Sequence, residues 1–311
     1  MVARLLFRTN TRRLREIVNI VAYFVGIVLL GSFLAPALYW AGRATAQYGV
    51  LTFLAETEFQ KFFNRAMLVA AVVLLWPAVR SLKLQGWGDL GLERDPRAGQ
   101  NLALGLGVAA LCLIPMCISY VILDVYRWKK ALPWEALPKL LLSSAVVAVL
   151  EETLFRGAIF GLFRRTMRPL GALFAVTTIF AVVHFLKPDE RVVVSEVNWG
   201  SGFALLPHVF HQFTEPITLL AGFTTLFVLG WVLGYATLRT SSLWVAMGFH
   251  AGVVFLKMSF SKFTKRQAEY LPWIGDELQI GLVPVAVLAI GGALFWWRFR
   301  DVNLGPNKSV R

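Results

Sequence analysis

The sequence predicts an all-α polytopic membrane protein with about eight transmembrane helices. Of the 311 residues, 57% are hydrophobic and only 16% are charged, and the mean hydropathy is +0.63. Soluble domains carry about a quarter charged residues. The apolar residues also fall into long segments, and basic residues gather in the short stretches between them. Together these observations indicate a helical protein embedded in a bilayer.

Each expected span is a segment close to the roughly 20 apolar residues that a helix needs to cross the hydrocarbon layer. The segments are 17–41, 63–80, 101–123, 138–163, 169–187, 215–238, 242–259 and 278–298. The first follows a basic stretch and precedes Ala44-Thr45-Ala46, which imitates a cleavable signal peptide. Its apolar run of about 24 residues is longer than the roughly 7–15 of a signal sequence, so we expect a retained span.

The net charge of +13 reflects basic residues at both ends and between spans. They lie in four stretches: Arg4 to Arg15, Arg80 to Arg97, Arg164 to Arg168 and Arg298 to Arg311. This pattern indicates cytoplasmic loops and attraction to anionic lipid headgroups, and no nucleic-acid partner is expected. We therefore expect a multi-pass protein with both termini in the cytoplasm. The compact eight-span architecture is typical of a bacterial inner-membrane protein. The basic loops 124–137 and 260–277 fall outside in this topology and weaken the rule.

Two connecting segments have mixed polarity. Segment 43–62 is expected to form an interfacial helix, and segment 188–214 an outer loop with an amphipathic part. The two cysteines, Cys112 and Cys117, lie in one apolar segment, so we expect them to serve packing.

The residues that indicate chemistry begin with Glu151-Glu152-Thr153-Leu154-Phe155-Arg156-Gly157, inside the fourth span. Ionisable groups at this depth usually face one another or a cavity, and they mark function. Arg156 is four residues after Glu152, so the two side chains can pair on one helix face. Glu151 is then left to project into a cavity and to serve as a general base toward water. The alternative is a structural ion pair that holds helices together.

Two of the four histidines, His184 and His250, lie in later apolar segments. An imidazole buried in a span needs a hydrogen-bond partner, and the carboxylates offer one. Together these groups could polarise a peptide carbonyl, hold a water molecule, or bind a metal ion with Glu151. A packing or interfacial role for His184 stays open. His208 and His211 form an H-x-x-H pair that we interpret as a surface pair because no third metal ligand is evident.

Small residues recur at four-residue spacing at Gly157/Gly161, Gly230/Gly234 and Gly248/Gly252. In lipid such pairs let helix backbones approach closely. We therefore expect tightly packed helices around the ionisable groups.

The ordered set Glu151-Glu152-x-x-x-Arg156, Phe180-x-x-x-His184 and His250 resembles the CPBP family of intramembrane proteases, also called the CAAX prenyl protease 2 or Abi family. Gly230-x-x-x-Gly234 and the run 240–244 ahead of His250 add to the likeness. The resemblance implies a helical catalytic core over 120–260. Residues 1–119 then form N-terminal membrane helices, and 261–311 a C-terminal helix with a basic tail, within one integrated membrane domain.

The resemblance also implies roles. Glu151 is similar to the glutamate that activates water, assisted by His184, and His250 to the histidine that helps to stabilise the oxyanion. Glu152 and Arg156 are similar to the supporting pair. The resemblance implies a membrane-anchored protein or peptide as substrate and no required cofactor. Zinc bound by Glu151, His184 and His250 remains the alternative.

One position departs from the family pattern, in which the last motif is usually His-x-x-x-Asn. Position 254 is Val here, and loss of one oxyanion donor can lower the rate by about a hundred- to a thousandfold. Either His250 suffices, another donor such as Asn198 folds in from the loop, or cleavage is slow or absent.

Three function classes therefore compete. The first is an intramembrane endopeptidase that uses a glutamate-activated water. The second is a non-catalytic member of the same family, a scaffold or bacteriocin-immunity protein, which Val254 favours. The third is a proton-coupled transporter, against which the lack of an evident inverted repeat argues.

Overall fold

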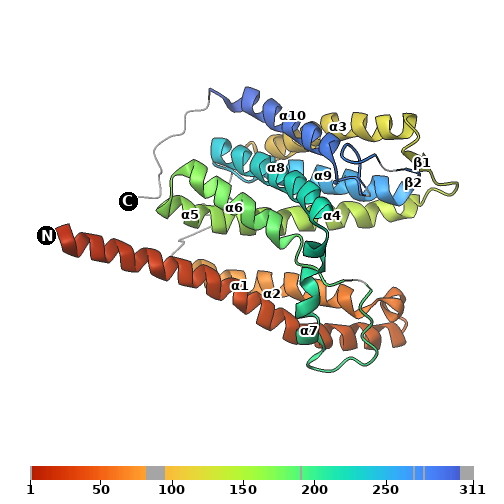
Figure 1. The fold of residues 1–311 in the computed structure, drawn as a ribbon, viewed down its shortest axis with the longest axis horizontal. Helices are drawn as coiled ribbons and strands as arrows, with labels where there is room; N and C mark the ends of the chain where they lie inside the picture. Colours follow the sequence, from red (N-terminus) through yellow and green to blue (C-terminus); the bar gives the residue numbers. More distant parts are fainter. Residues whose placement is uncertain (1, 82–94, 190, 269, 276, 302–311) are drawn as a thin grey trace. The chain divides into compact units, whose positions relative to one another are not determined.

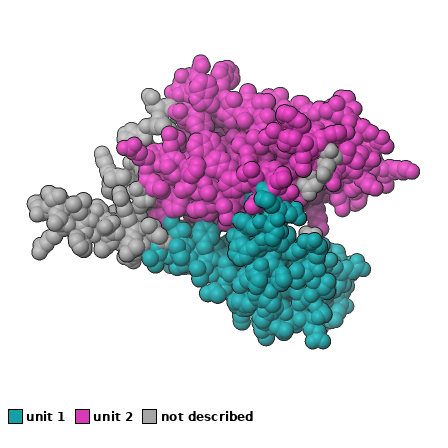
Figure 2. Space-filling model, in the orientation of Figure 1, with its two compact units in different colours: residues 1–84, 184–216 teal, residues 85–183, 217–311 magenta. Residues whose placement is uncertain are grey.

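The computed structural model describes residues 2–81, 95–189, 191–268, 270–275 and 277–301. The chain divides into two compact units (Figure 2). Unit 1 comprises residues 1–84 and 184–216, and unit 2 comprises residues 85–183 and 217–311. The positions of the two units relative to one another are not determined, so each is described by itself.

Unit 1 is built on two long helices, α1 (Val2–Gln47) and α2 (Phe59–Ser81), which pack against each other (Figure 1). Between them is a 3-10 turn, η1 (Thr52–Glu56). The short helix α7 (Ser201–Ala204) packs on α1 and is followed by the 3-10 segment η5 (Leu206–Thr214). Buried residues of α1, α2 and η5, with one residue between α7 and η5, form a common apolar core: Ala35, Phe59, Phe63, Ala66, Val209 and Leu205.

The single interfacial helix expected over 43–62 is not formed. Helix α1 continues to Gln47, and the chain then reverses at Gly49 and Leu51, which have positive φ angles of 76° and 52°. A left-handed residue ends a helix because its carbonyl and amide no longer align with the helix axis. By contrast, short helical pieces do occur in the expected outer loop 188–214.

Unit 2 contains the remaining helices and a two-stranded sheet (Figure 1). Its helices are α3 (Ala98–Ile122), α4 (Leu137–Glu151), α5 (Phe160–Thr166), α6 (Pro169–Val183), α8 (Pro216–Thr240), α9 (Trp244–Phe263) and α10 (Leu282–Phe299), with a 3-10 turn η3 (Trp134–Ala136) ahead of α4. Strands β1 (Tyr126–Trp128) and β2 (Thr264–Arg266) pair antiparallel, with Arg127 opposite Lys265. Helix α9 is central because it packs against both α3 and α4.

The expected fourth span is helical throughout, but it changes helix type. A π-helical segment, η4 (Glu152–Ile159), separates α4 from α5, and the helical backbone runs on from Leu137 to Thr166. π-turns are rare and occur frequently at functional sites. Glu151 is the last residue of α4 and Glu152 the first of η4, so the acidic pair lies at the change of helix type.

The described residues include six helices that are long and apolar enough to cross a membrane: Val18–Gln47, Phe59–Ala78, Ala98–Ile122, Pro216–Thr240, Trp244–Phe263 and Leu282–Phe299. Helix α6, the expected fifth span, is apolar but has only 15 residues. The fourth is divided by η4. The all-α polytopic class is confirmed, whereas the number of eight spans is not.

Two of the three glycine pairs, Gly230/Gly234 and Gly248/Gly252, bring helices into close contact as expected. A Cβ atom added at Gly248 of α9 would lie 2.1 Å from the carbonyl oxygen of Leu102 in α3, and one at Gly252 would lie 2.7 Å from Cβ of Ala109. In the second pair, a Cβ at Gly234 of α8 would lie 2.3 Å from Cδ1 of Leu173 in α6. The approaches at Gly248 and Gly252 leave no room for a side chain, so α9 packs closely against α3.

Two parts of the basic stretches lie outside the described residues: residues 82–94 of the stretch from Arg80 to Arg97, and the tail after residue 301.

Candidate active site

The candidate site is a cluster of Glu151, Glu152, Arg156 and His250 within unit 2. The first three come from the junction of α4 and η4, and His250 comes from α9, which packs against α4. Glu152, Arg156 and His250 are buried, with exposed fractions of 0%, 3% and 2%. Charged groups at such depth are stable only when they are paired.

Glu152 and Arg156 form the ion pair expected from their spacing. Nη1 of Arg156 donates to Oε1 of Glu152 at 2.9 Å, and the pair lies on one side of the π-helical segment. A second guanidinium nitrogen, Nη2, donates to the backbone carbonyl of Gly230 in α8 at 3.2 Å. The arginine therefore ties η4 to α8 as well as neutralising Glu152.

His250 lies between the two glutamates. Its Nδ1 is 2.7 Å from Oε1 of Glu152, and its Nε2 is 3.8 Å from Oε2 of Glu151. The short contact has hydrogen-bond length, and with Nδ1–H as the donor Oε1 of Glu152 accepts from both Arg156 and His250. This bond fixes the ring so that Nε2 faces Glu151. The longer separation exceeds hydrogen-bond length.

The two carboxylates therefore occupy different environments, as the sequence indicated. The side chain of Glu152 has an exposed fraction of 0%, whereas that of Glu151 is 21% exposed. The more accessible glutamate is the one that can meet a water molecule or a substrate. Glu152 has its place in the interior, where it orients His250.

Two supports of the cluster were not evident from the sequence. The ring of Phe180, in α6, lies 4.2 Å beneath the guanidinium carbon of Arg156 and meets the His250 ring edge-on at 6.1 Å. The second support is the backbone carbonyl of Gly230, which accepts a hydrogen bond from Arg156. Phe180 was noted in the sequence only as part of the Phe180-x-x-x-His184 pattern. A guanidinium carries five N–H donors and packs favourably on an aromatic ring. A buried arginine in a membrane span could therefore have suggested partners in addition to Glu152.

The other predicted residues lie in unit 1. His184 directly follows α6 and is the first residue of the second segment of unit 1, and its side chain is half-buried. Asn198 is exposed, and its Oδ1 accepts a hydrogen bond from the Gly200 N–H. In the pair of His208 and His211, Nδ1 of His211 contacts the carbonyl oxygen of His208 at 3.2 Å. The structure therefore does not place these residues with respect to the carboxylates of unit 2.

Val254 is half-buried and lies four residues after His250 on α9, so both occupy one face of the helix. Among the residues that the structure describes, there is no group of three or more His, Cys, Asp or Glu side chains that could hold a metal ion. The zinc ligands considered from the sequence, Glu151, His184 and His250, are divided between the two units.

Residues 133–256 match the family model described as type II CAAX prenyl endopeptidase Rce1-like. The matched segment contains the whole cluster, from Glu151 to His250. The resemblance to the CPBP family is confirmed. A comparison with curated proteins gives no match.

At the level of the family, the match supports a CAAX protease-type membrane endopeptidase. Together with the six apolar helices, it identifies the chain as an integral, multi-pass membrane protein. The match ends at residue 256 and so includes Val254, the position at which this sequence departs from the family motif.

Proposed function

We propose that this protein is an intramembrane endopeptidase that hydrolyses a peptide bond of a membrane-anchored protein or peptide, with Glu151 as the base that activates water. The observation that carries the proposal is the position of the His250 ring, which bonds Glu152 through Nδ1 and turns Nε2 toward Glu151 at 3.8 Å. The cluster lies within the segment that matches the endopeptidase family.

The proposed division of labour follows from accessibility. Glu151, the more exposed carboxylate, accepts a proton from a water molecule as its oxygen attacks the scissile carbonyl carbon. The attack converts the carbonyl oxygen into an oxyanion. With Nδ1–H bonded to Glu152, Nε2 of His250 carries a proton when the ring is the imidazolium, and in that form it can donate a hydrogen bond to the oxyanion. The oxyanion then re-forms the carbonyl as the C–N bond breaks, and the proton on Glu151 passes to the leaving amine, so the carboxylate is regenerated.

Glu152 and Arg156 act in this proposal as positioning residues. The Arg156 bond to the Gly230 carbonyl and the Glu152 bond to His250 form a chain from α8 to α9. Such preorganisation keeps the imidazole in place without reorganisation during the reaction. His184 is proposed to assist Glu151, which requires unit 1 to bring it to the cluster.

The Glu151→Gln variant tests the proposal. The amide has nearly the same shape as the carboxylate but cannot take a proton from water, so we expect cleavage to be lost while the fold is retained. The measurement compares the C-terminal peptides of membrane proteins from cells that carry wild-type or variant protein. Glu135→Gln, at an exposed carboxylate of η3, is the matched control and should cleave as wild type does.

Retention of a wild-type cleavage product by Glu151→Gln cells would exclude Glu151 as the base. If no C-terminus changes between cells with and without the wild-type protein, the non-catalytic alternative is favoured. Val254, in place of an asparagine that would donate to the oxyanion, would then explain the loss of activity. A proton-coupled transporter instead predicts pH-dependent flux in liposomes that Glu151→Gln removes.

The proposed reaction needs no metal ion. We expect the purified protein to keep its cleavage activity after incubation with a chelator of divalent cations, because Glu151 itself supplies the base. Loss of activity on chelation, with recovery when zinc is added back, would favour the alternative in which Glu151, His184 and His250 hold zinc.

A further inference from the structure

Part of segment 188–214 packs against a membrane span of unit 1, although the sequence predicts an outer loop there. Helix α7 of this segment lies against α1 (Figure 1). A Cβ atom added at Gly202 of α7 would lie 2.0 Å from the carbonyl oxygen of Ser32 in α1, so the two backbones touch. The depth of Ser32 in the membrane therefore gives the depth of α7.

Ser32 lies in the hydrocarbon layer wherever the crossing of α1 is centred. The stretch 17–42 of α1 contains no charged residue. A helix needs about 20 apolar residues to cross the hydrocarbon, so a crossing at the N-terminal end of this stretch covers about 17–36, and one at the C-terminal end covers about 23–42. All placements share residues 23–36. Ser32 belongs to this shared part.

The chain around α7 has the composition that this depth requires. From 197 to 214 the sequence contains no Asp, Glu, Lys or Arg, whereas Glu196 and Glu215 stand directly on either side. Leu205 within this interval shares the buried core of unit 1 with Ala35, which also lies in the common part of the span. Charged side chains are costly in hydrocarbon. The uncharged interval thus coincides with the part of the segment that packs on the span.

The backbone at the start of α7 forms its hydrogen bonds within the segment. The Gly200 N–H donates to Oδ1 of Asn198 at 2.8 Å, and the Asn198 N–H donates to Oγ of Ser201 at 2.9 Å. The N–H groups of Ser201 and Ala204 donate to the carbonyls of Asn198 and Gly200, each at 3.0 Å. Irregular backbone is tolerated at membrane depth only where its polar groups are satisfied without bulk water. These four donors meet that condition.

Aromatic side chains form an exposed surface on this segment. The Trp199 ring stacks on that of Phe33 with centroids 5.0 Å apart and meets the Trp40 ring edge-on at 4.9 Å. Phe33 and Trp40 are themselves exposed residues of α1, and Trp199, Phe203 and Phe210 are exposed as well. The aromatic surface is therefore continuous with the exposed side of α1, which a bilayer covers.

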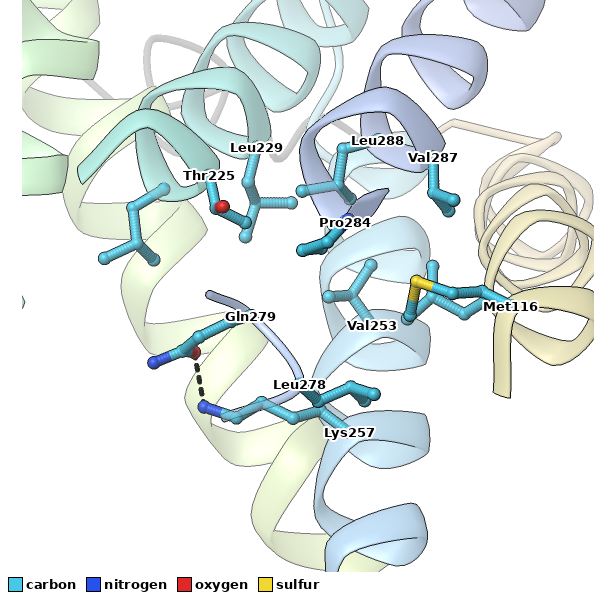
Figure 3. Close-up of a pocket in the computed structure, with 12 residues that line it drawn as sticks. Met116, Thr225, Leu229, Val253, Lys257, Leu278, Gln279, Pro284, Val287 and Leu288 are labelled. Carbon is cyan, nitrogen blue, oxygen red and sulfur yellow. Dashed lines mark hydrogen bonds between the residues drawn. The ribbon is translucent and has the colours of Figure 1, made fainter. Parts of the chain in front are cut away.

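Apolar side chains that face the interior of the protein are arranged differently. The apolar cavity of unit 2, which Met116, Val253 and Leu288 help to line, has a volume of about 50 Å³, room for a few water molecules at most (Figure 3). The side chains of Lys257 and Gln279 beside it bond each other. The aromatic rings of segment 197–214 lie on the surface instead, where their apolar partner has to come from outside the chain.

We propose that residues 197–214 are embedded in the lipid leaflet, with Trp199, Phe203 and Phe210 among the acyl chains. The partner of this surface is the hydrocarbon of the bilayer, and no particular headgroup is required. The charged residues before it stay on the aqueous side, where the side-chain amide of Gln60, at the start of α2, bonds the Val192 carbonyl. The embedding does not rest on the proposed protease function and holds equally for the Glu151→Gln variant.

The test measures the depth of nitroxide labels on single cysteines in the full chain, reconstituted in liposomes after Cys112 and Cys117 are replaced by alanine. Collisions of the label with oxygen, which concentrates in hydrocarbon, are compared with collisions with a water-soluble nickel complex. Leu29 is exposed in the common part of the span and supplies the hydrocarbon reference. We expect the ratio of the two collision rates at Phe203→Cys and Phe210→Cys to be close to that at Leu29→Cys.

Two other positions of unit 1 supply the aqueous reference. Tyr48 is 87% exposed in the turn after α1, and Val193 is 85% exposed among the charged residues of the same connecting segment. We expect the nickel complex to reach labels at Tyr48→Cys and Val193→Cys readily. Ratios at Phe203→Cys and Phe210→Cys that match the one at Val193→Cys would overturn the proposal, because the segment would then be a loop in water.

Trp199 allows a second measurement that needs no cysteine variant. Phosphatidylcholine brominated on its acyl chains quenches tryptophans that touch the chains, and aqueous iodide quenches those in water. The contribution of Trp199 is the difference between wild type and Trp199→Phe, which keeps a ring against Phe33. We expect Trp199→Phe to lose quenching by the brominated lipid and to keep the iodide quenching of wild type. Loss of iodide quenching with unchanged lipid quenching would place Trp199 in water and contradict the embedding.

Discussion

Arg156 illustrates how single residues define this protein. Its guanidinium bonds the Glu152 carboxylate and the Gly230 carbonyl and stacks on the Phe180 ring. Removing one partner of a buried ion pair costs about 3–5 kcal/mol, because the remaining charge stays buried without compensation. The cluster is consequently a structural element of unit 2 as well as a candidate for catalysis, and the two interpretations offered by the sequence are compatible.

Val254 is the residue at which a substitution is expected to raise the rate of the proposed cleavage. Its side chain lies four residues after His250 on the same helix face, where the family pattern has asparagine. We expect Val254→Asn to raise the rate of cleavage by about tenfold or more, because one amide donor to an oxyanion is worth about a hundred- to a thousandfold in a preorganised site. The measurement is kcat on a substrate identified by its changed C-terminus.

Val254→Leu is the control, since leucine has the size and branching of asparagine without its donor. It should leave the rate at or below that of wild type. Equal rates for the asparagine variant and wild type would indicate that His250, or a donor such as Asn198, already serves the oxyanion.

At the level of elements, the contact between α3 and α9 places His250. A Cβ atom at Gly105 of α3 would lie 2.2 Å from the carbonyl oxygen of Val245 and 2.5 Å from the amide nitrogen of Phe249, both in the backbone of α9. Backbone atoms at such distances cannot be avoided by a rotamer change. The two helices must separate if any side chain is introduced there.

We therefore expect Gly105→Ala to lower both the thermal unfolding temperature and the cleavage rate. Gly107→Ala is a matched control two residues further along α3, where a Cβ meets nothing within 4 Å. It should be neutral or slightly stabilising, because alanine favours a helix over glycine by about 1 kcal/mol. Thermal unfolding of the two variants in the same detergent measures the difference, and similar unfolding temperatures would contradict the packing argument.

The elements also show how far the sequence could be interpreted. The pairing of Glu152 with Arg156 follows from four-residue spacing, and the burial of His250 with the carboxylates follows from the cost of an unpartnered imidazole in lipid. The π-helical segment could not be predicted, because the hydrophobic pattern of 138–163 suits an α-helix equally well. The Arg156 side chain of this segment contacts Gly230 and Phe180, which are far away in the sequence. The role of His184 remains a prediction.

The whole molecule raises the question of which side of the membrane each end of unit 2 faces. The antiparallel pairing of β1 with β2 brings Arg127, Lys265 and Arg266 together at one end of unit 2. The expected topology puts this basic end outside, against the positive-inside tendency, and the loop with Arg164 and Arg168 inside. The wider distribution of basic residues, including both termini, favours that arrangement.

The topology can be checked by cysteine labelling after Cys112 and Cys117 are replaced by alanine. We expect Arg127→Cys to react with a membrane-impermeant maleimide in intact cells, and Arg168→Cys to react only after permeabilisation. Both positions are exposed ends of unit 2, so accessibility reports the side of the membrane. The reverse labelling pattern would place the termini outside and invert the orientation of every span.

Because Glu151 and Glu152 are adjacent, the role of each depends on the register of the helix. Neighbouring helical residues point about 100° apart, so a slip of the α4–η4 backbone by a single position would move one glutamate to the place of the other and fill the vacated place with Leu150 or Thr153. The two places would then hold a single carboxylate, so either the accessible glutamate or the glutamate that bonds His250 would be missing. Insertion or deletion of one residue ahead of this motif could be absorbed elsewhere in the helix only if Arg156 kept its bond to Gly230. The identity of the accessible carboxylate is thus encoded in helix register.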